Sequence, residues 1–236
     1  MFLLAGVIGC TPFSERLMKK GDIETGNEVS LNSGESEASF DYTPCLDQES
    51  SRIVRSYGST IKRQALKYGF DWRLILAVMK QESRFLPYAE SHKGASGFMQ
   101  IMPNTSAEVA RVLHIEDMTR PQNNIRGGTY YLGRLYNLFE GAEESNRIKL
   151  TLASYNAGVG RVYDAQELAA YFDENPTTWH AVRDALPLLS KRFYTLHENV
   201  WSQDKPKSGW FGNATETVNY VEKVMSYYEE YKAVLN

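Results

Sequence analysis

Residues 70–87 read FDWRLILAVMKQESRFLP and carry the signals of an apolar helix that leads into a single glutamate. Asp71 is a preferred residue type for a helix N-cap, and Phe70 pairs with Ile75 at the fourth helical position as a hydrophobic staple. The buried face of this helix is expected to comprise Trp72, Ile75, Leu76 and Met79. The segment therefore predicts a helix that presents Glu82 at its C-terminal end, before the loop that Pro87 closes.

Helical periodicity extends over the chain beyond residue 50. A four-residue apolar period ends at Gly69, and a capping box at residues 105–108 opens a helix that runs to Leu113. Further helices are expected over residues 124–139, 148–154, 176–186 and 217–231. The irregular stretch 84–103 leaves room for a small hairpin, and there is neither βαβ alternation nor a repeat. The patterns predict a mainly α-helical domain with a small β element.

Three glycines stand inside the helix expected over residues 124–139, at positions 127, 128 and 133. Each costs about 1 kcal/mol relative to alanine in a helix interior. We therefore expect another backbone or a ligand to press closely against this helix.

The 236 residues suit one domain of ordinary size with an additional arm. Residues 1–50 hold three Lys or Arg and nine Asp or Glu, whereas the remaining residues carry a net charge of +3. Residues 51–236 are too weakly basic for a nucleic-acid-binding domain, and no Lys/Arg stripe with interleaved aromatic residues occurs. They would tolerate an anionic polymer as substrate.

The first ten residues, MFLLAGVIGC, form an apolar run that is too short to span a membrane, which takes about 20 residues. The run is typical of a secretory signal, and residues 7–10 resemble a bacterial lipobox with Cys10 as the lipid attachment site. No Lys or Arg precedes it, as expected of a start that lies further upstream. We expect a signal peptide at residues 1–9, an acidic tether at residues 10–49 and a catalytic domain at residues 50–236.

Metal and covalent serine chemistry are not favoured by the sequence. The four histidines lie far apart without the spacing of metal ligands, both cysteines are N-terminal, and no nucleophile elbow is present. We therefore expect no metal and no cofactor.

Glu82 is the best candidate for an acid catalyst. At the C-terminal end of a helix the dipole disfavours negative charge, and a cleft walled by aromatic residues would disfavour it further through desolvation. Both effects would raise the pKa of Glu82, as a general acid near neutral pH requires. On position alone, a solvated glutamate at a helix end is the favoured interpretation.

The strings around Glu82 decide between these interpretations. QES at 81–83, GASGFMQIMPNT at 94–105, ASYNAG at 153–158 and ETVNYVEKV at 216–224 occur in that order. Together they resemble the SLT-type lytic transglycosylase catalytic domain of the lysozyme-like superfamily. NPTTWHAVRDALPLLS at 175–190 is similar to the membrane-bound lytic transglycosylase F branch. The resemblance implies an α+β lysozyme-like fold, in which a helical bundle carries a small β element beside the active-site cleft.

The resemblance also implies roles for individual residues. Glu82 matches the acid/base, and the matching substrate-binding positions are Ser83, Met99, Gln100, Tyr155, Asn156, Glu216 and Tyr220. Val218 stands where many relatives have Arg, so one charged contact to the substrate is expected to be missing. The substrate would be the glycan strands of peptidoglycan, cut between N-acetylmuramic acid and N-acetylglucosamine to leave a 1,6-anhydromuramic acid end.

Two rival functions stay open. A goose-type-lysozyme-like hydrolase would need a second carboxylate about 6.5–9.5 Å away to activate water. Asp71 lies roughly 16 Å along the same helix, whereas Glu90 or Asp164 could fold nearby. The other rival is a catalytically silent cell-wall-binding lipoprotein. In each case we expect a monomer in the bacterial cell envelope, anchored through Cys10 to the periplasmic face of the outer membrane.

Overall fold

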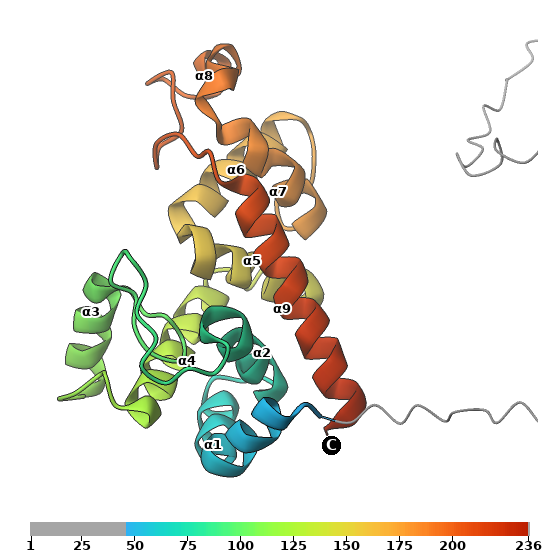
Figure 1. The fold of residues 1–236 in the computed structure, drawn as a ribbon. Coiled ribbons are helices and arrows are strands. Elements are labelled where there is room, and N and C mark those ends of the chain that lie inside the picture. Colours follow the sequence, from blue (N-terminus) through green and yellow to red (C-terminus); the bar gives the residue numbers. More distant parts are fainter. Residues whose placement is uncertain (1–45, 236) are drawn as a thin grey trace, which may run out of the picture. The chain divides into compact units, whose positions relative to one another are not determined.

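The computed structural model describes residues 46–235, which form nine α-helices and two short 3-10 turns (Figure 1). The helices are α1 (Gln48–Lys67), α2 (Trp72–Ser83), α3 (Pro103–Leu113), α4 (Pro121–Asn137), α5 (Glu144–Ala157), α6 (Val159–Tyr171), α7 (Trp179–Ala185), α8 (Tyr194–Val200) and α9 (Ala214–Val234). The 3-10 turns are η1 (Leu186–Leu189) and η2 (Lys191–Phe193). The mainly helical fold predicted from the sequence is confirmed. The expected signal peptide, Cys10 and nearly all of the expected tether lie outside the described residues.

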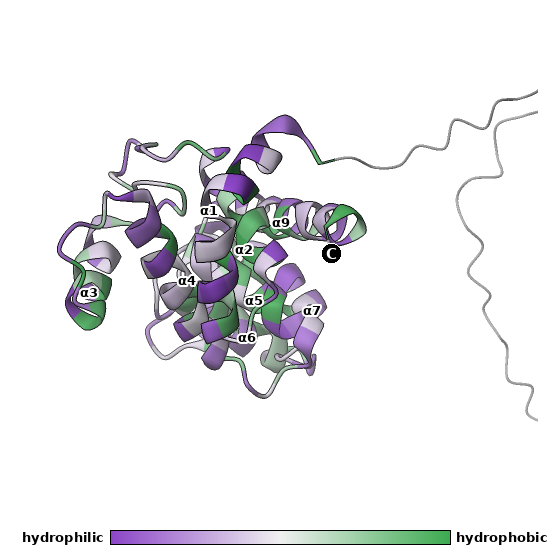
Figure 2. Ribbon diagram, turned by 90° about the horizontal axis from the view of Figure 1, so that it is seen from below, coloured by the Kyte–Doolittle hydropathy of each residue, from purple (hydrophilic) through white to green (hydrophobic). Residues whose placement is uncertain are grey.

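The helix α2 forms the centre of the core. Its residues 74–79 are all buried, and it packs against α1 on one side and α9 on the other. Figure 2 shows the hydrophilic residues mainly on the outer surfaces of the helices, with the hydrophobic stretches between them. Burial of one large aliphatic side chain contributes about 1.5–3 kcal/mol, so α2 is fixed firmly in place. Among residues 46–235, no helix combines the length and apolar character that crossing a membrane requires.

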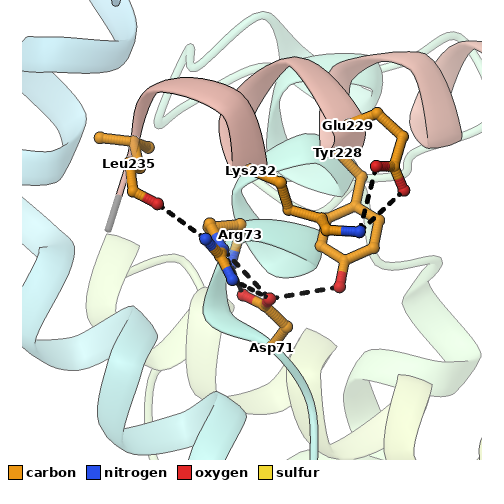
Figure 3. Close-up of polar contacts among 6 residues, drawn as sticks. All are labelled: Asp71, Arg73, Tyr228, Glu229, Lys232 and Leu235. Atoms are coloured by element: carbon orange, nitrogen blue, oxygen red, sulfur yellow. Dashed lines mark hydrogen bonds and ion pairs between the residues drawn. The ribbon is translucent and has the colours of Figure 1, made fainter.

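The N-terminus of α2 is tied to the C-terminus of α9. Asp71 caps α2 by accepting a hydrogen bond from the Arg73 backbone N at 2.9 Å, as the sequence predicted. Arg73 pairs with the Asp71 carboxylate and donates to the Leu235 carbonyl at 2.7 Å, and Tyr228 donates to Asp71 at 3.2 Å (Figure 3). Because these contacts join opposite ends of the two helices, α2 and α9 run antiparallel, and the C-terminal turn of α2 lies beside the N-terminal half of α9.

Several predicted helix boundaries are wrong, and one long helix was missed. The helix α3 begins at Pro103 without a side-chain cap, and α4 begins at Pro121, because proline fits the first turn of a helix. The helix α1 begins at Gln48, two residues before the expected domain boundary. The 13-residue helix α6 was not predicted, because two glycines at its start resemble a turn; Gly158 is in fact its N-cap, with a φ of 89°.

The expected small β element consists of two isolated bridges between α2 and α3. Ser96 pairs with Glu90 and with Ile101 in antiparallel fashion. Asn124 of α4 holds this loop, since its side chain donates to the Ser96 carbonyl at 3.0 Å and accepts from the Met99 backbone N at 2.9 Å. A Cβ on Gly97 would lie 2.4 Å from the Asn124 amide, so this contact requires glycine.

The glycines of α4 make room for side chains, not for another backbone or a ligand as the sequence led us to expect. An added Cβ would meet Met118 at Gly127, Met99 at Gly128 and Tyr68 at Gly133. At Gly128 the added Cβ would lie 2.5 Å from the Met99 sulfur. The small residues therefore let α4 pack closely on α1 and on the loop that precedes α3.

Candidate active site

Glu82 lies in the last turn of α2 and keeps only part of its surface exposed. Its Oε1 accepts a hydrogen bond from the Tyr220 hydroxyl of α9 at 2.7 Å. Burial raises the pKa of Glu82 to about 7, and the hydrogen bond from Tyr220 partly opposes this rise. The raised pKa agrees with the expectation from the sequence. Near neutral pH, Glu82 is therefore able to exchange a proton in either direction.

Two tyrosines respond to the charge of Glu82. Burial, and then the negative charge of Glu82, raise the pKa values of Tyr155 and Tyr220 well above the usual value of 10.0. Both hydroxyls therefore stay protonated and act as donors. The Tyr155 hydroxyl donates to the Met99 carbonyl at 2.7 Å, and the Tyr155 ring packs on the Tyr131 ring with centroids 5.6 Å apart. For Glu82 itself, burial is the main cause that disfavours the ionised form.

A cavity of about 300 Å³ opens at Glu82. Its lining residues are Gln81, Glu82, Asn156, Glu216, Asn219, Tyr220 and Lys223. Four of the predicted site residues thus meet in one pocket, although they come from α2, α5 and α9. The pocket holds hydrogen-bonding groups at its walls, as a site for a polar ligand requires.

Asn156 of α5 and Glu216 of α9 both line this pocket. The exposed Asn156 accepts at Oδ1 from the Thr217 hydroxyl at 2.8 Å, which leaves its NH₂ group for a ligand. Glu216 stands in the exposed first turn of α9 and accepts from the Asn213 side chain at 3.2 Å. Thr217 therefore orients the amide through a contact between α5 and α9.

Besides Tyr155, three further predicted site residues do not line this pocket. Ser83 is buried and donates to the carbonyls of Met79 and Phe98, at 3.2 and 3.0 Å. The Gln100 side chain donates to the Ala89 and Gly97 carbonyls, both at 3.0 Å. Met99 is completely buried. The contacts in the structure make these three residues positioning residues for the loop beside Glu82, and their direct contact with a ligand stays a prediction.

Sequence reasoning missed three lining residues. Gln81 directly precedes Glu82, and Asn219 and Lys223 flank Tyr220 on α9. The helical spacing of Asn219, Tyr220 and Lys223 was a usable signal, because Lys223 lies four positions after Asn219 and three after Tyr220, and residues three and four positions apart are neighbours on a helix surface.

The pocket at Glu82 continues into a cavity on either side. A cavity of about 290 Å³ shares Asn156 and Glu216 with it and also contains Lys93, Arg161 and Trp210. A cavity of about 400 Å³ shares Gln81 and Lys223 with it and extends to Arg84 and Tyr227. Glu82 therefore lies in the middle segment of a groove made of three adjoining cavities.

Glu216 is the other carboxylate that lines the Glu82 pocket among residues 46–235. Asp71 is bound to Arg73 at the far end of α2. Asp164 lines a separate cavity that shares no residue with the groove, and Glu90 forms part of a β bridge. Asp71, Glu90 and Asp164 were the candidates for a second carboxylate. None of the three lines the pocket with Glu82.

Comparison with known proteins identifies the family of this chain. The family model described as "Transglycosylase SLT domain" matches residues 59–177, just over half of the sequence. The chain belongs to this transglycosylase SLT domain family.

Curated relatives and a solved structure extend the comparison. The membrane-bound lytic murein transglycosylase F of Desulfosudis oleivorans is 35% identical over 170 residues, which cover 72% of this chain and 35% of the relative. The protein of the same name from Shewanella pealeana is 36% identical over 193 residues, which cover 80% and 37%. The 70 kDa soluble lytic transglycosylase of Escherichia coli superposes with a TM-score of 0.53 at 25% identity, over 79% of this chain and 25% of that one. The chain spans about a third of the length of the curated relatives that it matches.

Proposed function

We propose that the protein is a peptidoglycan lytic transglycosylase. It would cleave the β-1,4 bond between N-acetylmuramic acid and N-acetylglucosamine without water and leave a 1,6-anhydromuramic acid end. The observation that carries the proposal is the half-buried Glu82, with a pKa of about 7, in the middle of an elongated groove. The names of the relatives, which describe lytic murein transglycosylases, support the same activity.

In the first step, protonated Glu82 donates its proton to the glycosidic oxygen. The bond from this oxygen to C1 of the muramic acid breaks, and positive charge develops at C1 and the ring oxygen. Tyr220 donates to Glu82 Oε1 and stabilises the carboxylate that forms. Burial of Glu82 favours its protonated form before the step.

In the second step, the Glu82 carboxylate takes the proton from the C6 hydroxyl of the same muramic acid. The C6 oxygen attacks C1 and closes the anhydro ring, and Glu82 returns to its protonated state. An oriented internal hydroxyl competes well with bulk water, because its attack carries little further entropic cost. One carboxylate therefore serves as acid and then as base. We propose that Asn156 and Glu216 contact the sugars in this pocket.

The elongated groove supports a polymeric substrate. Its two outer cavities add Trp210 on one side and Tyr227 on the other, and both contain cationic side chains. Aromatic rings offer flat apolar surfaces for sugar rings. A small substrate would need only the middle cavity, whereas a glycan strand would occupy all three.

Digestion of purified sacculi tests the proposal, with mass spectrometry of the released muropeptides. Wild-type protein should release products that lack one water relative to hydrolysis products. Glu82→Gln keeps the shape of the side chain but removes the transferable proton, so it should release none above background. Anhydro products from Glu82→Gln at the wild-type rate would refute the role of Glu82.

Hydrolysis is a second candidate, because Glu216 lines the same pocket as Glu82. In that reaction Glu216 would activate a water molecule on the opposite face of the sugar. Products that contain the added water would establish hydrolysis. Binding of sacculi without any released muropeptide would instead establish a silent wall-binding protein.

We also propose that the protein is held at a membrane of the bacterial cell envelope by lipid on Cys10, as a monomer. Support comes from the lipobox-like residues 7–10 and from the relatives, which are named membrane-bound. Cys10→Ser should move the protein from the membrane fraction to the soluble fraction of cells. Unchanged fractionation would refute the anchor.

A further inference from the structure

A further cavity lies outside the groove that contains Glu82. It has a volume of about 560 Å³ and shares no lining residue with the three cavities of the groove. One wall is the outer face of α6, with Tyr163, Asp164 and Glu167 at helical spacing. The opposite wall contains Lys207 and Ser208 of the loop between α8 and α9, beyond the residues that the family model matches.

The two walls are fixed to each other by hydrogen bonds. The Ser208 backbone N donates to Asp164 Oδ2 at 2.8 Å, and the Trp201 indole N donates to Glu167 Oε2 at 2.6 Å. Lys207 pairs with Glu167. Gly160 lets the loop approach, because an added Cβ would lie 2.3 Å from the Ser208 hydroxyl. The cavity is therefore built into the fold, and a ligand would find its polar groups already oriented.

Asp164 is the feature that points to a ligand. The residue is only 1% exposed, yet it lines the cavity, and no salt bridge within the described part of the chain involves it. A carboxylate has about four acceptor positions, and the hydrogen bond from Ser208 occupies one of them. A buried carboxylate is costly unless donors satisfy it. A ligand with hydroxyl or amide donors would supply them.

Tyr163 supplies the apolar part of the site. Its ring contacts the buried Phe139 ring, with centroids 6.0 Å apart, and 39% of the residue stays exposed. Ala170 and Pro176 extend this apolar surface. The cavity thus combines an aromatic surface with acceptors held at fixed positions, and its two carboxylates outnumber its one lysine. This charge disfavours phosphates and carboxylates as ligands.

We propose that this cavity, which we call the α6 site, binds a second stretch of glycan through an N-acetylhexosamine ring. The flat C–H face of a pyranose would lie on Tyr163, and its hydroxyl groups would donate to Asp164 and Glu167. The choice of glycan as the ligand rests on the proposed function, whereas the cavity itself does not. The α6 site would hold the enzyme on its insoluble substrate while another strand occupies the groove.

Two tryptophans allow the α6 site and the groove to be observed separately. The Trp201 indole N–H is bonded to Glu167 in the α6 site, and Trp210 lines the groove. The full chain carrying Glu82→Gln is labelled with ¹⁵N and titrated with chitotetraose, a soluble β-1,4 tetramer of N-acetylglucosamine. We expect the Trp201 indole resonance to shift in a saturable manner, whether or not Trp210 also shifts.

Tyr163→Ala tests the site in the same background, with Tyr171→Ala as the matched control. Tyr171 is an exposed tyrosine on the same helix that does not line the cavity. Tyr163→Ala should weaken the Trp201 response about tenfold, as expected from the loss of one aromatic contact, whereas Tyr171→Ala should leave it unchanged. An unaltered Trp210 environment verifies that each variant is folded.

Two results would overturn the α6 site, namely a Trp201 resonance that does not respond to chitotetraose and equal weakening by both tyrosine variants. The response of the Trp201 resonance does not depend on which products the enzyme releases from sacculi. A Trp201 response in a protein that releases no muropeptide would retain the site and reject the proposed activity.

Discussion

Tyr220 and Glu82 are 138 positions apart in the chain, and a hydrogen bond of 2.7 Å joins the tyrosine hydroxyl to the carboxylate. The contact depends on the antiparallel packing of α2 and α9, which sets the last turn of one helix against the first half of the other. Tyr220 was expected only to bind substrate. The structure places it directly on the candidate acid, where it opposes the effect of burial on the Glu82 pKa.

Tyr220→Phe should move the pH profile of the reaction. The hydrogen bond from Tyr220 lowers the Glu82 pKa, so its loss should raise that pKa further above 7. The first step needs protonated Glu82, and activity should therefore fall as pH rises through the pKa. We expect the descending limb of kcat/KM to lie near pH 7 in the wild type and at higher pH in Tyr220→Phe. Tyr227→Phe, in the outer part of the groove, is the control and should keep the wild-type profile. If the wild type and both variants shared one descending limb, Tyr220 would have no effect on the Glu82 pKa.

Glu82 should also make protein stability depend on pH. Its pKa is about 7 in the folded state and near the ordinary glutamate value of 4.5 in the unfolded state. The folded state therefore binds the proton more tightly, and stability is lost as pH rises from about 4.5 to 7. The loss is on the order of 3 kcal/mol at most. Glu82→Gln lacks this titration, so its melting temperature should match the wild type at pH 4 and exceed it at pH 8.

Thermal melts at a series of pH values check this result. Glu216→Gln is the matched control, since Glu216 is exposed in the same pocket. A constant difference between wild type and Glu82→Gln across the pH range would contradict the raised pKa of Glu82.

Arg73→Ala should destabilise the domain and reduce activity together. Arg73 joins Asp71 at the start of α2 to the Leu235 carbonyl at the end of α9 (Figure 3). Its removal leaves Asp71 without its cation and loosens the register that brings Glu82 to Tyr220. We expect a loss of about 1–2 kcal/mol in the free energy of unfolding. Lys232→Ala removes an exposed pair with Glu229 in the same region and should cost less than about 0.5 kcal/mol. Urea unfolding measures the free energy of unfolding of the two variants. Equal losses would contradict a stabilising role for the contacts of Arg73 between α2 and α9.

Gly128→Ala should be destabilising although alanine favours helix. The propensity gain of about 1 kcal/mol is opposed by a Cβ that would lie 2.5 Å from the Met99 sulfur and 2.7 Å from its Cβ. Overpacking of this kind costs about 1–3 kcal/mol. Gly58→Ala in α1 is the control, because its added Cβ meets Val54 at an ordinary 3.6 Å and should stabilise. Chemical unfolding of both variants measures the difference, and stabilisation by Gly128→Ala would show that Met99 moves freely.

The sequence predicted the parts of the fold that local chemistry determines. Asp71 caps α2 as expected, since an N-cap needs only its own helix. Glu82 was found as the candidate acid because helix position and the motif around it agreed. The helix α6 was missed, because Gly158 and Gly160 resemble a turn when the packing of Ser208 against Gly160 is unknown. Likewise, no local signal indicated that Ser83 and Gln100 would use their side chains to hold the loop beside Glu82. Such roles depend on contacts between distant segments.

Glu216→Gln separates the two chemistries that the pocket allows. Glu216 lines the pocket with Glu82, but it is exposed in the first turn of α9, whereas Glu82 is half-buried. We therefore expect Glu216 to contact the sugar without transferring a proton. In that case Glu216→Gln should raise KM on sacculi several-fold, keep kcat within about tenfold of the wild type, and leave the anhydro product unchanged.

A water-activating base would behave differently, because its loss costs about 10²–10⁴ in kcat. Asn219→Ala, in the same pocket, gives the scale for loss of a simple contact. A fall in kcat of a thousandfold with Glu216→Gln alone would assign the pocket to hydrolysis.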